Sequence, residues 1–200
     1  MKITLIGSAN NWQDAPSEGE TWGIHAVCLH RPVSMLWHLH KFDEEDYVCV
    51  PENEEIIKRY VNENKVPMMC LKKHDDIPTS MAFPIEEMEL KYSESSISYM
   101  VWYAIHIGAT EIDLYGILMA AFDEYHEQLK SVEYWIGYAR GKGIKVTIHE
   151  PTAICKGRQG LYGYDFVNEP TPMGSCYKKK NDPDPDALYV LQRWRQGAQV

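Results

Sequence analysis

The sequence has no long hydrophobic run and no closely paired cysteines. No apolar stretch approaches the roughly 18 residues that a membrane-spanning helix needs, and the first residues lack the basic and apolar regions of a signal peptide. The five cysteines are widely spaced and form no C-x-x-C pair, which is typical of reduced intracellular thiols. We therefore expect a soluble, cytoplasmic protein without a membrane partner.

Positive charge is also scarce. The chain has 20 Lys and Arg residues against 29 Asp and Glu residues, a formal net charge of -9, which argues against a general nucleic-acid surface. A free nucleotide remains a candidate ligand, because backbone amides can bind phosphate within an acidic protein. A nucleophile elbow is also missing, so hydrolase and thiol-redox functions have no motif in their favour.

A helix, a tight loop and a buried strand are predicted between residues 94 and 120. Ser95 and Ser96 can cap a helix, because their hydroxyls accept hydrogen bonds from backbone amides of the first turn. Apolar residues then recur at helical spacing, and residues 111–115 have the pattern of a central strand. In open α/β sheets ligands bind beyond the carboxyl ends of the strands, so Gly116 and the serine cap would share that edge.

The rest of the pattern alternates strands with helices. Strands are predicted at 1–6, 21–28, 34–40, 66–71 and 144–148, helices from 51, at 85–90 and at 125–140, and a loop at 74–84. This predicts one α/β domain over residues 1–165, a doubly wound, mainly parallel sheet of the Rossmann type. Gly137 is expected to let its helix approach the sheet. Residues 166–200 are expected to form an irregular arm, a lid or a contact between copies, with a short helix at 187–196.

A loop of small residues, Gly7-Ser8-Ala9-Asn10-Asn11, directly follows the first strand. Such a loop is the usual opening of a nucleotide-binding α/β domain, although this one is neither G-x-G-x-x-G nor a P-loop. Asn10 and Asn11 can hydrogen-bond a base, a ribose or a phosphate. They are equally suited to a turn that needs left-handed backbone conformations.

Four histidines fall at or just beyond the carboxyl ends of predicted strands, namely His25, His40, His74 and His149. In a parallel sheet they share one edge with the opening loop, where a histidine can act as a general base or acid. His149 is the first candidate for a catalytic residue because it follows the last central strand, and His25 is a second. Exposure of polar strand ends to water explains the same pattern without catalysis. His38 and His40 are spaced for joint metal ligation, but no further ligand motif accompanies them.

The stretch SSISYMVWYAIHIGATEIDLYGI resembles a segment of bacterial sialyltransferase-like proteins and of the related group that includes the archaeal hydroxymethylpterin pyrophosphokinase. The opening ITLIGSANNW is similar to their first strand and nucleotide loop. The pairing of ETWGIHAVCLHRP with YHEQLKSVEYWIGYARGKGIKV resembles small bacteriophage and prophage proteins over most of residues 1–164.

The resemblance implies a Rossmann-like nucleotide-dependent transferase, most simply a glycosyltransferase that uses a nucleotide-sugar. The residues that it assigns to the nucleotide, its phosphates or its sugar are Gly7, Ser8, Ala9, Asn10, Ser95, Ser96 and Gly116. The family pattern has an acidic residue two places after that last glycine, where this chain has Leu118. The alternative is therefore a phage-type protein that binds or sequesters a nucleotide-derived ligand without turnover.

Overall fold

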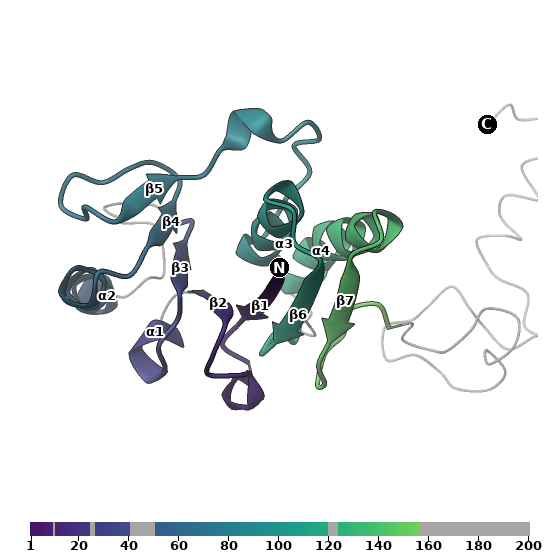
Figure 1. Ribbon diagram of the computed structural model, residues 1–200, viewed down its shortest axis with the longest axis horizontal. Helices are drawn as coiled ribbons and strands as arrows, with labels where there is room; N and C mark the ends of the chain where they lie inside the picture. The colour runs from purple at the N-terminus through teal and green to yellow at the C-terminus, as the bar shows by residue number, and fades with distance from the viewer. Residues whose placement is uncertain (10, 25–26, 41–50, 120–123, 157–200) are drawn as a thin grey trace, which may run out of the picture. The chain divides into compact units, whose positions relative to one another are not determined.

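The computed structural model describes residues 1–9, 11–24, 27–40, 51–119 and 124–156 (Figure 1). Its strands are β1 (Lys2–Ile6), β2 (Glu20–Ile24), β3 (Met35–His38), β4 (Met68–Cys70), β5 (Ser80–Ala82), β6 (Glu111–Tyr115) and β7 (Lys145–Ile148). Its helices are α1 (Val27–His30), α2 (Pro51–Asn64), α3 (Ser96–His106) and α4 (Glu124–Gly141), with 3-10 turns η1 (Trp12–Asp14) and η2 (Ile85–Glu87). None of these helices is long and apolar enough to span a membrane.

The chain divides into a compact unit, Met1–Cys155, and a second unit, Lys156–Val200. Of the second unit only Lys156 is described. The predicted arm at 166–200 and its helix therefore lie outside the described residues.

All seven strands run parallel in a single sheet with the order β5-β4-β3-β2-β1-β6-β7. This confirms the predicted doubly wound α/β sheet. The helices cover both faces, with α3 and α4 on one side and α1 and α2 on the other (Figure 1). The amino end of α3 lies at the carboxyl edge of the strands, because α3 connects the end of β5 to the start of β6.

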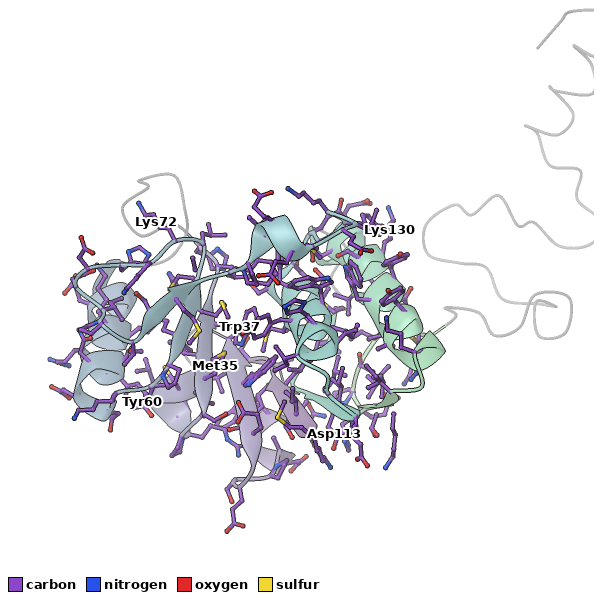
Figure 2. The ribbon with its side chains drawn as sticks, turned by 45° about the horizontal axis from the view of Figure 1, so that its top comes forward. Met35, Trp37, Tyr60, Lys72, Asp113 and Lys130 are labelled. Atoms are coloured by element: carbon purple, nitrogen blue, oxygen red, sulfur yellow. The ribbon has the colours of Figure 1, made fainter. Side chains whose placement is uncertain are left out.

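Two hydrophobic cores flank the sheet. Within β1, Ile3 and Leu5 join the core beneath α3 and α4, whereas Ile6 joins the core beneath α1 and α2. Trp37 of β3 lies in the first core (Figure 2). Its ring centroid is 5.4 Å from that of Trp22. The predicted apolar stripes of α3 and α4 are buried in the same core at Ile97, Met100, Val101, Ala104, Val132, Trp135, Ile136 and Ala139. Helical periodicity therefore predicted correctly which faces of these helices are buried.

Several local predictions were wrong. β2 ends at Ile24 instead of residue 28, and α1 begins at Val27. The predicted loop at 74–84 contains β5, which is only three residues long and too short to show an alternating pattern. Gly137 does not bring α4 close to the sheet. It is exposed, and a Cβ added there would meet nothing within 4 Å.

In its described residues, the connection from β1 to β2 contains η1 and no α-helix. Arg31 holds this connection in place by donating hydrogen bonds to the backbone oxygens of Trp12 and Ala15, both at 3.0 Å, and of Pro16 at 2.5 Å. No helix in the described part of the chain covers β6 and β7 on the face opposite α3 and α4 (Figure 1). We call this part of the sheet the open face. Glu111 and Asp113 of β6 point toward it, because they alternate with residues of the core beneath α3 and α4.

Two cysteines belong to the core beneath α1 and α2. Burial raises the pKa of the Cys28 thiol to about 11 and that of Cys70 to about 12, from an ordinary value of 9.0. The folded state therefore holds these protons more tightly than the unfolded state. The resulting stability is complete below about pH 9 and is lost as the pH rises through the folded pKa values. Between about pH 9 and its folded pKa, each thiol lowers the free energy of unfolding by about 1.4 kcal/mol for every unit that the pH rises.

Cys70→Ala should make the free energy of unfolding less dependent on pH. Between about pH 10 and 11 we expect the slope to become shallower by about 1.4 kcal/mol per pH unit, because alanine does not titrate. Urea unfolding at a series of pH values measures the slope. Val61→Ala, in the same core, is the control, because it should lower the stability by a similar amount at every pH. A Cys70→Ala slope equal to that of the wild type would contradict the raised thiol pKa.

Candidate functional site

The strand order reverses between β1 and β6. From β1 the chain moves outward through β2, β3, β4 and β5 on one side, and it then crosses to β6 on the other. In open α/β sheets ligands bind beyond the carboxyl ends of the strands at such a reversal. The segments that follow β1, β6 and β7 therefore form the candidate site.

Gly7 and Gly116, two of the predicted site residues, lie in direct backbone contact at this edge. Gly7 N donates to Tyr115 O at 2.8 Å, and Ala9 N donates to Gly116 O at 2.8 Å. A Cβ added to either glycine would lie less than 3.0 Å from the carbonyl oxygen of the other. Gly116 also has a φ of +64°, in the left-handed region that favours glycine. The two positions therefore require glycine for packing, whatever the ligand.

Asn11 joins the three segments of the site. Its backbone is left-handed, with a φ of 77°. Its Oδ1 accepts a hydrogen bond from Gly116 N at 2.7 Å, and its Nδ2 donates to Glu150 O at 2.6 Å. Of the two roles that the sequence left open, the structure assigns the turn to this residue. The amides of Gly7, Ala9 and Gly116 are likewise engaged within the protein, so a phosphate at this edge would need other donors.

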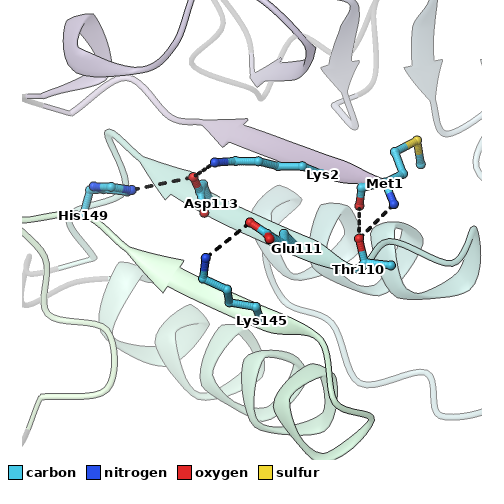
Figure 3. Close-up of polar contacts among 7 residues, drawn as sticks. All are labelled: Met1, Lys2, Thr110, Glu111, Asp113, Lys145 and His149. Carbon is cyan, nitrogen blue, oxygen red and sulfur yellow. Dashed lines mark hydrogen bonds and ion pairs between the residues drawn. The ribbon is translucent and has the colours of Figure 1, made fainter.

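His149 directly follows β7, and its ring turns back over the open face (Figure 3). The ring stacks on Tyr115, with centroids 3.7 Å apart and planes 12° apart. Its Nε2 lies 3.9 Å from Oδ2 of Asp113, and Lys2 Nζ contacts the same oxygen at 2.7 Å. The ring thus faces the sheet rather than the contact between the glycines, although Tyr115 immediately precedes Gly116. The structure therefore brings one predicted catalytic histidine to the reversal of strand order, together with a carboxylate.

Ser95 and Ser96 lie at the start of α3, as predicted. Ser95 is the N-cap: its Oγ accepts a hydrogen bond from Ser98 N at 3.2 Å, and its own N donates to Ser98 Oγ at 3.2 Å. Glu94 N donates to Ser131 Oγ and so ties the cap to α4. The Ser95 hydroxyl is therefore engaged within its own helix terminus, while the helix dipole remains directed at the carboxyl edge of the strands.

The other predicted site residues are placed less fully. Ser8 is exposed at the edge, whereas Asn10 and His25 lie outside the described residues. His38 ends β3 and is fully buried, with its ring centroid 5.8 Å from that of His40. Within the ranges that the structure describes, no three His, Cys, Asp or Glu side chains lie together in a way that could hold a metal ion. The H-x-H pair thus gains no third ligand there.

The sequence interpretation missed Lys2 and Asp113. The signal was present in residues 111–115, because Glu111, Asp113 and Tyr115 alternate with apolar residues. Such alternation is typical of a strand with one uncovered face. The stretch was interpreted as the central strand of a buried sheet, and Asp113 was therefore not recognised as a neighbour of His149.

Comparisons of the chain with family models, with curated proteins and with solved structures found no match.

Proposed function

We propose that this chain is a nucleotide-dependent transferase that uses a nucleotide-sugar, with its site at the carboxyl edge between β1 and β6. The observation that carries the proposal is the position of His149: its ring stacks on Tyr115 at the end of β6, beside the reversal of strand order, with Nε2 3.9 Å from the Asp113 carboxylate. A histidine with a carboxylate on one nitrogen can use its other nitrogen as a base near neutral pH.

In the proposed reaction an acceptor hydroxyl gives its proton to His149. The hydroxyl oxygen forms a bond to the anomeric carbon of the sugar, while the bond from that carbon to the nucleotide phosphate breaks and its electron pair leaves with the phosphate. The amino end of α3 lies at the same edge of the sheet, and its dipole favours the negative charge that develops on the leaving group.

Binding without turnover is the second candidate, and one observation favours it. Leu118 stands where the family pattern has an acidic residue, and this leucine is 38% exposed. A phage-type protein that sequesters a nucleotide-derived ligand would retain the fold without the catalytic contacts.

Thermal melting against nucleotides and nucleotide-sugars tests both functions. A ligand at about 100 times its dissociation constant adds about 2.7 kcal/mol, which corresponds to a rise in Tm of roughly 5 to 10 °C for a domain of this size. Each ligand is then analysed by mass spectrometry, in the presence of a panel of sugar acceptors. The free sugar and the free nucleotide serve as controls that show which half is recognised.

A rise in Tm with a cleaved nucleotide-sugar would support the transferase. A rise with the ligand intact, whichever acceptor is added, would support the binding protein and contradict the transferase. If no ligand raises the Tm, both proposals fail for the nucleotides tested.

A further inference from the structure

The two ring nitrogens of His149 have different surroundings. Nε2 is fully buried, and the Asp113 carboxylate faces it at 3.9 Å. The side chain as a whole is 32% exposed, and Tyr115 covers one face of its ring. Of the two ring nitrogens, only Nε2 is buried without a hydrogen-bond partner. Nδ1 is therefore the nitrogen that is left for an incoming substrate.

The carboxylate that faces Nε2 is itself fixed in place. Asp113 is only 6% exposed, and its Oδ2 accepts from Lys2 Nζ at 2.7 Å (Figure 3). A buried carboxylate that accepts a charged donor has little freedom to turn toward water. The negative charge therefore stays in front of the buried nitrogen of His149.

We infer that Asp113, held by Lys2, is a positioning residue that fixes the tautomer of His149, with the proton on Nε2 and the lone pair on Nδ1. A proton on Nε2 is attracted by the carboxylate, whereas a lone pair at that position would face a negative oxygen. Carboxylates set the tautomer of histidine in this way next to metal ions and in catalytic triads. The catalytic meaning of the inference rests on the proposed transferase function: Nδ1 takes the proton of the acceptor hydroxyl, while Asp113 stabilises the imidazolium that forms.

The distance of 3.9 Å is longer than a hydrogen bond, so the contact between Nε2 and Asp113 is an attraction between a donor and a charge. Catalytic hydrogen bonds are often long without substrate and shorten in the complex. The burial of the Nε2 atom and of the Asp113 carboxylate preserves the attraction, because solvent screens buried charges less than exposed ones.

The open face also supplies a matched control. Glu111 lies two residues before Asp113 on β6, on the same face, and pairs with Lys145 Nζ at 3.5 Å (Figure 3). Both groups of this pair are more exposed than Asp113, at 36% and 69% of their side chains. Glu111→Gln therefore removes a carboxylate from the same strand and face and leaves the pair of Asp113 with His149 in place.

The test is the tautomer of His149, measured by NMR on protein with 15N-labelled histidine. The wild type should show the Nε2–H tautomer alone, and Glu111→Gln should be identical to it. Asp113→Asn should show a mixture with the Nδ1–H form, because an amide can donate to Nε2 as well as accept from it. A wild-type spectrum with Nδ1–H, or the same tautomer population in wild type and Asp113→Asn, would overturn the inference. The wild-type spectrum keeps the test decisive even if Asp113→Asn fails to fold.

An activity measurement separates this inference from the proposed function. If the protein turns over a nucleotide-sugar, Asp113→Asn should lower kcat by roughly 10- to 100-fold and leave KM unchanged. Glu111→Gln should leave both kcat and KM unchanged. Equal turnover in wild type and Asp113→Asn would also overturn the positioning role. The NMR result needs no substrate. A tautomer that depends on Asp113 in a chain without turnover would support the positioning and contradict only the transferase.

Discussion

Gly116→Ala is expected to lower the free energy of unfolding by about 3 kcal/mol or more. A Cβ at this position would lie 2.5 Å from Gly7 O and 2.9 Å from the Cβ of Trp12. Two residues of the connection from β1 to β2 would have to move, in a buried backbone contact that is close-packed. The left-handed φ of +64° adds strain of roughly 1 to 2 kcal/mol for a residue with a Cβ. Thermal melting should show a fall in Tm of about 6 to 12 °C.

Gly7→Ala separates the steric part of this effect from the backbone strain. Its Cβ would lie 2.3 Å from Gly116 O, closer than the 2.5 Å of the reverse contact, but its φ is not in the left-handed region. Gly7→Ala should therefore destabilise the protein by a comparable amount through steric overlap alone. The control is Gly137→Ala, which lies exposed within α4 with nothing within 4 Å of the added Cβ. It should raise the stability by about 0.5 to 1 kcal/mol. If the Tm of Gly116→Ala equals that of the wild type, the loops that carry Gly7 and Gly116 are not held in contact.

The elements that the sequence predicted well are those with local signals. The Ser95 cap and the apolar repeat of α3 lie within one turn or one face of the same helix, so their meaning does not depend on distant residues. β1, β6 and α4 also have enough residues to show their period. The short strand β5 has only three residues, and its pairing with β4 follows from the tertiary structure rather than from its own pattern.

The site was predicted less completely because its contacts join distant parts of the chain. Gly7 and Gly116 were each identified as loop glycines, but no pattern in the sequence shows that their backbones meet across more than a hundred residues. The same holds for Asn11, whose amide is divided between Gly116 and Glu150. The position of the loop directly after β1 correctly indicated the edge of the sheet at which it lies. It gave no indication that the loop amides would be used within the protein.

His149→Gln is expected to lower the kcat of the proposed transfer by about 10²- to 10⁴-fold, which is the usual contribution of a general base. Glutamine is a close replacement in shape, and its amide can turn an N–H toward Asp113, as the inferred Nε2–H tautomer of His149 does. It cannot take a proton near neutral pH. The loss should therefore appear in kcat, with little change in KM or in the affinity for the nucleotide-sugar. The stability should change by no more than about 1 kcal/mol, mostly through the lost stacking on Tyr115.

His106→Gln is the matched control for this experiment. His106 stacks on Trp102 with centroids 4.8 Å apart and pairs with Glu87 at 3.2 Å, so it is also a histidine with an aromatic and an acidic neighbour. It ends α3 at the opposite edge of the sheet from the site, because β6 starts just after it. Its replacement should change the melting temperature by a similar amount and leave kcat and KM as in the wild type. A wild-type kcat in His149→Gln would remove this residue from the mechanism. Equal losses in both variants would show that activity follows stability rather than a base at position 149.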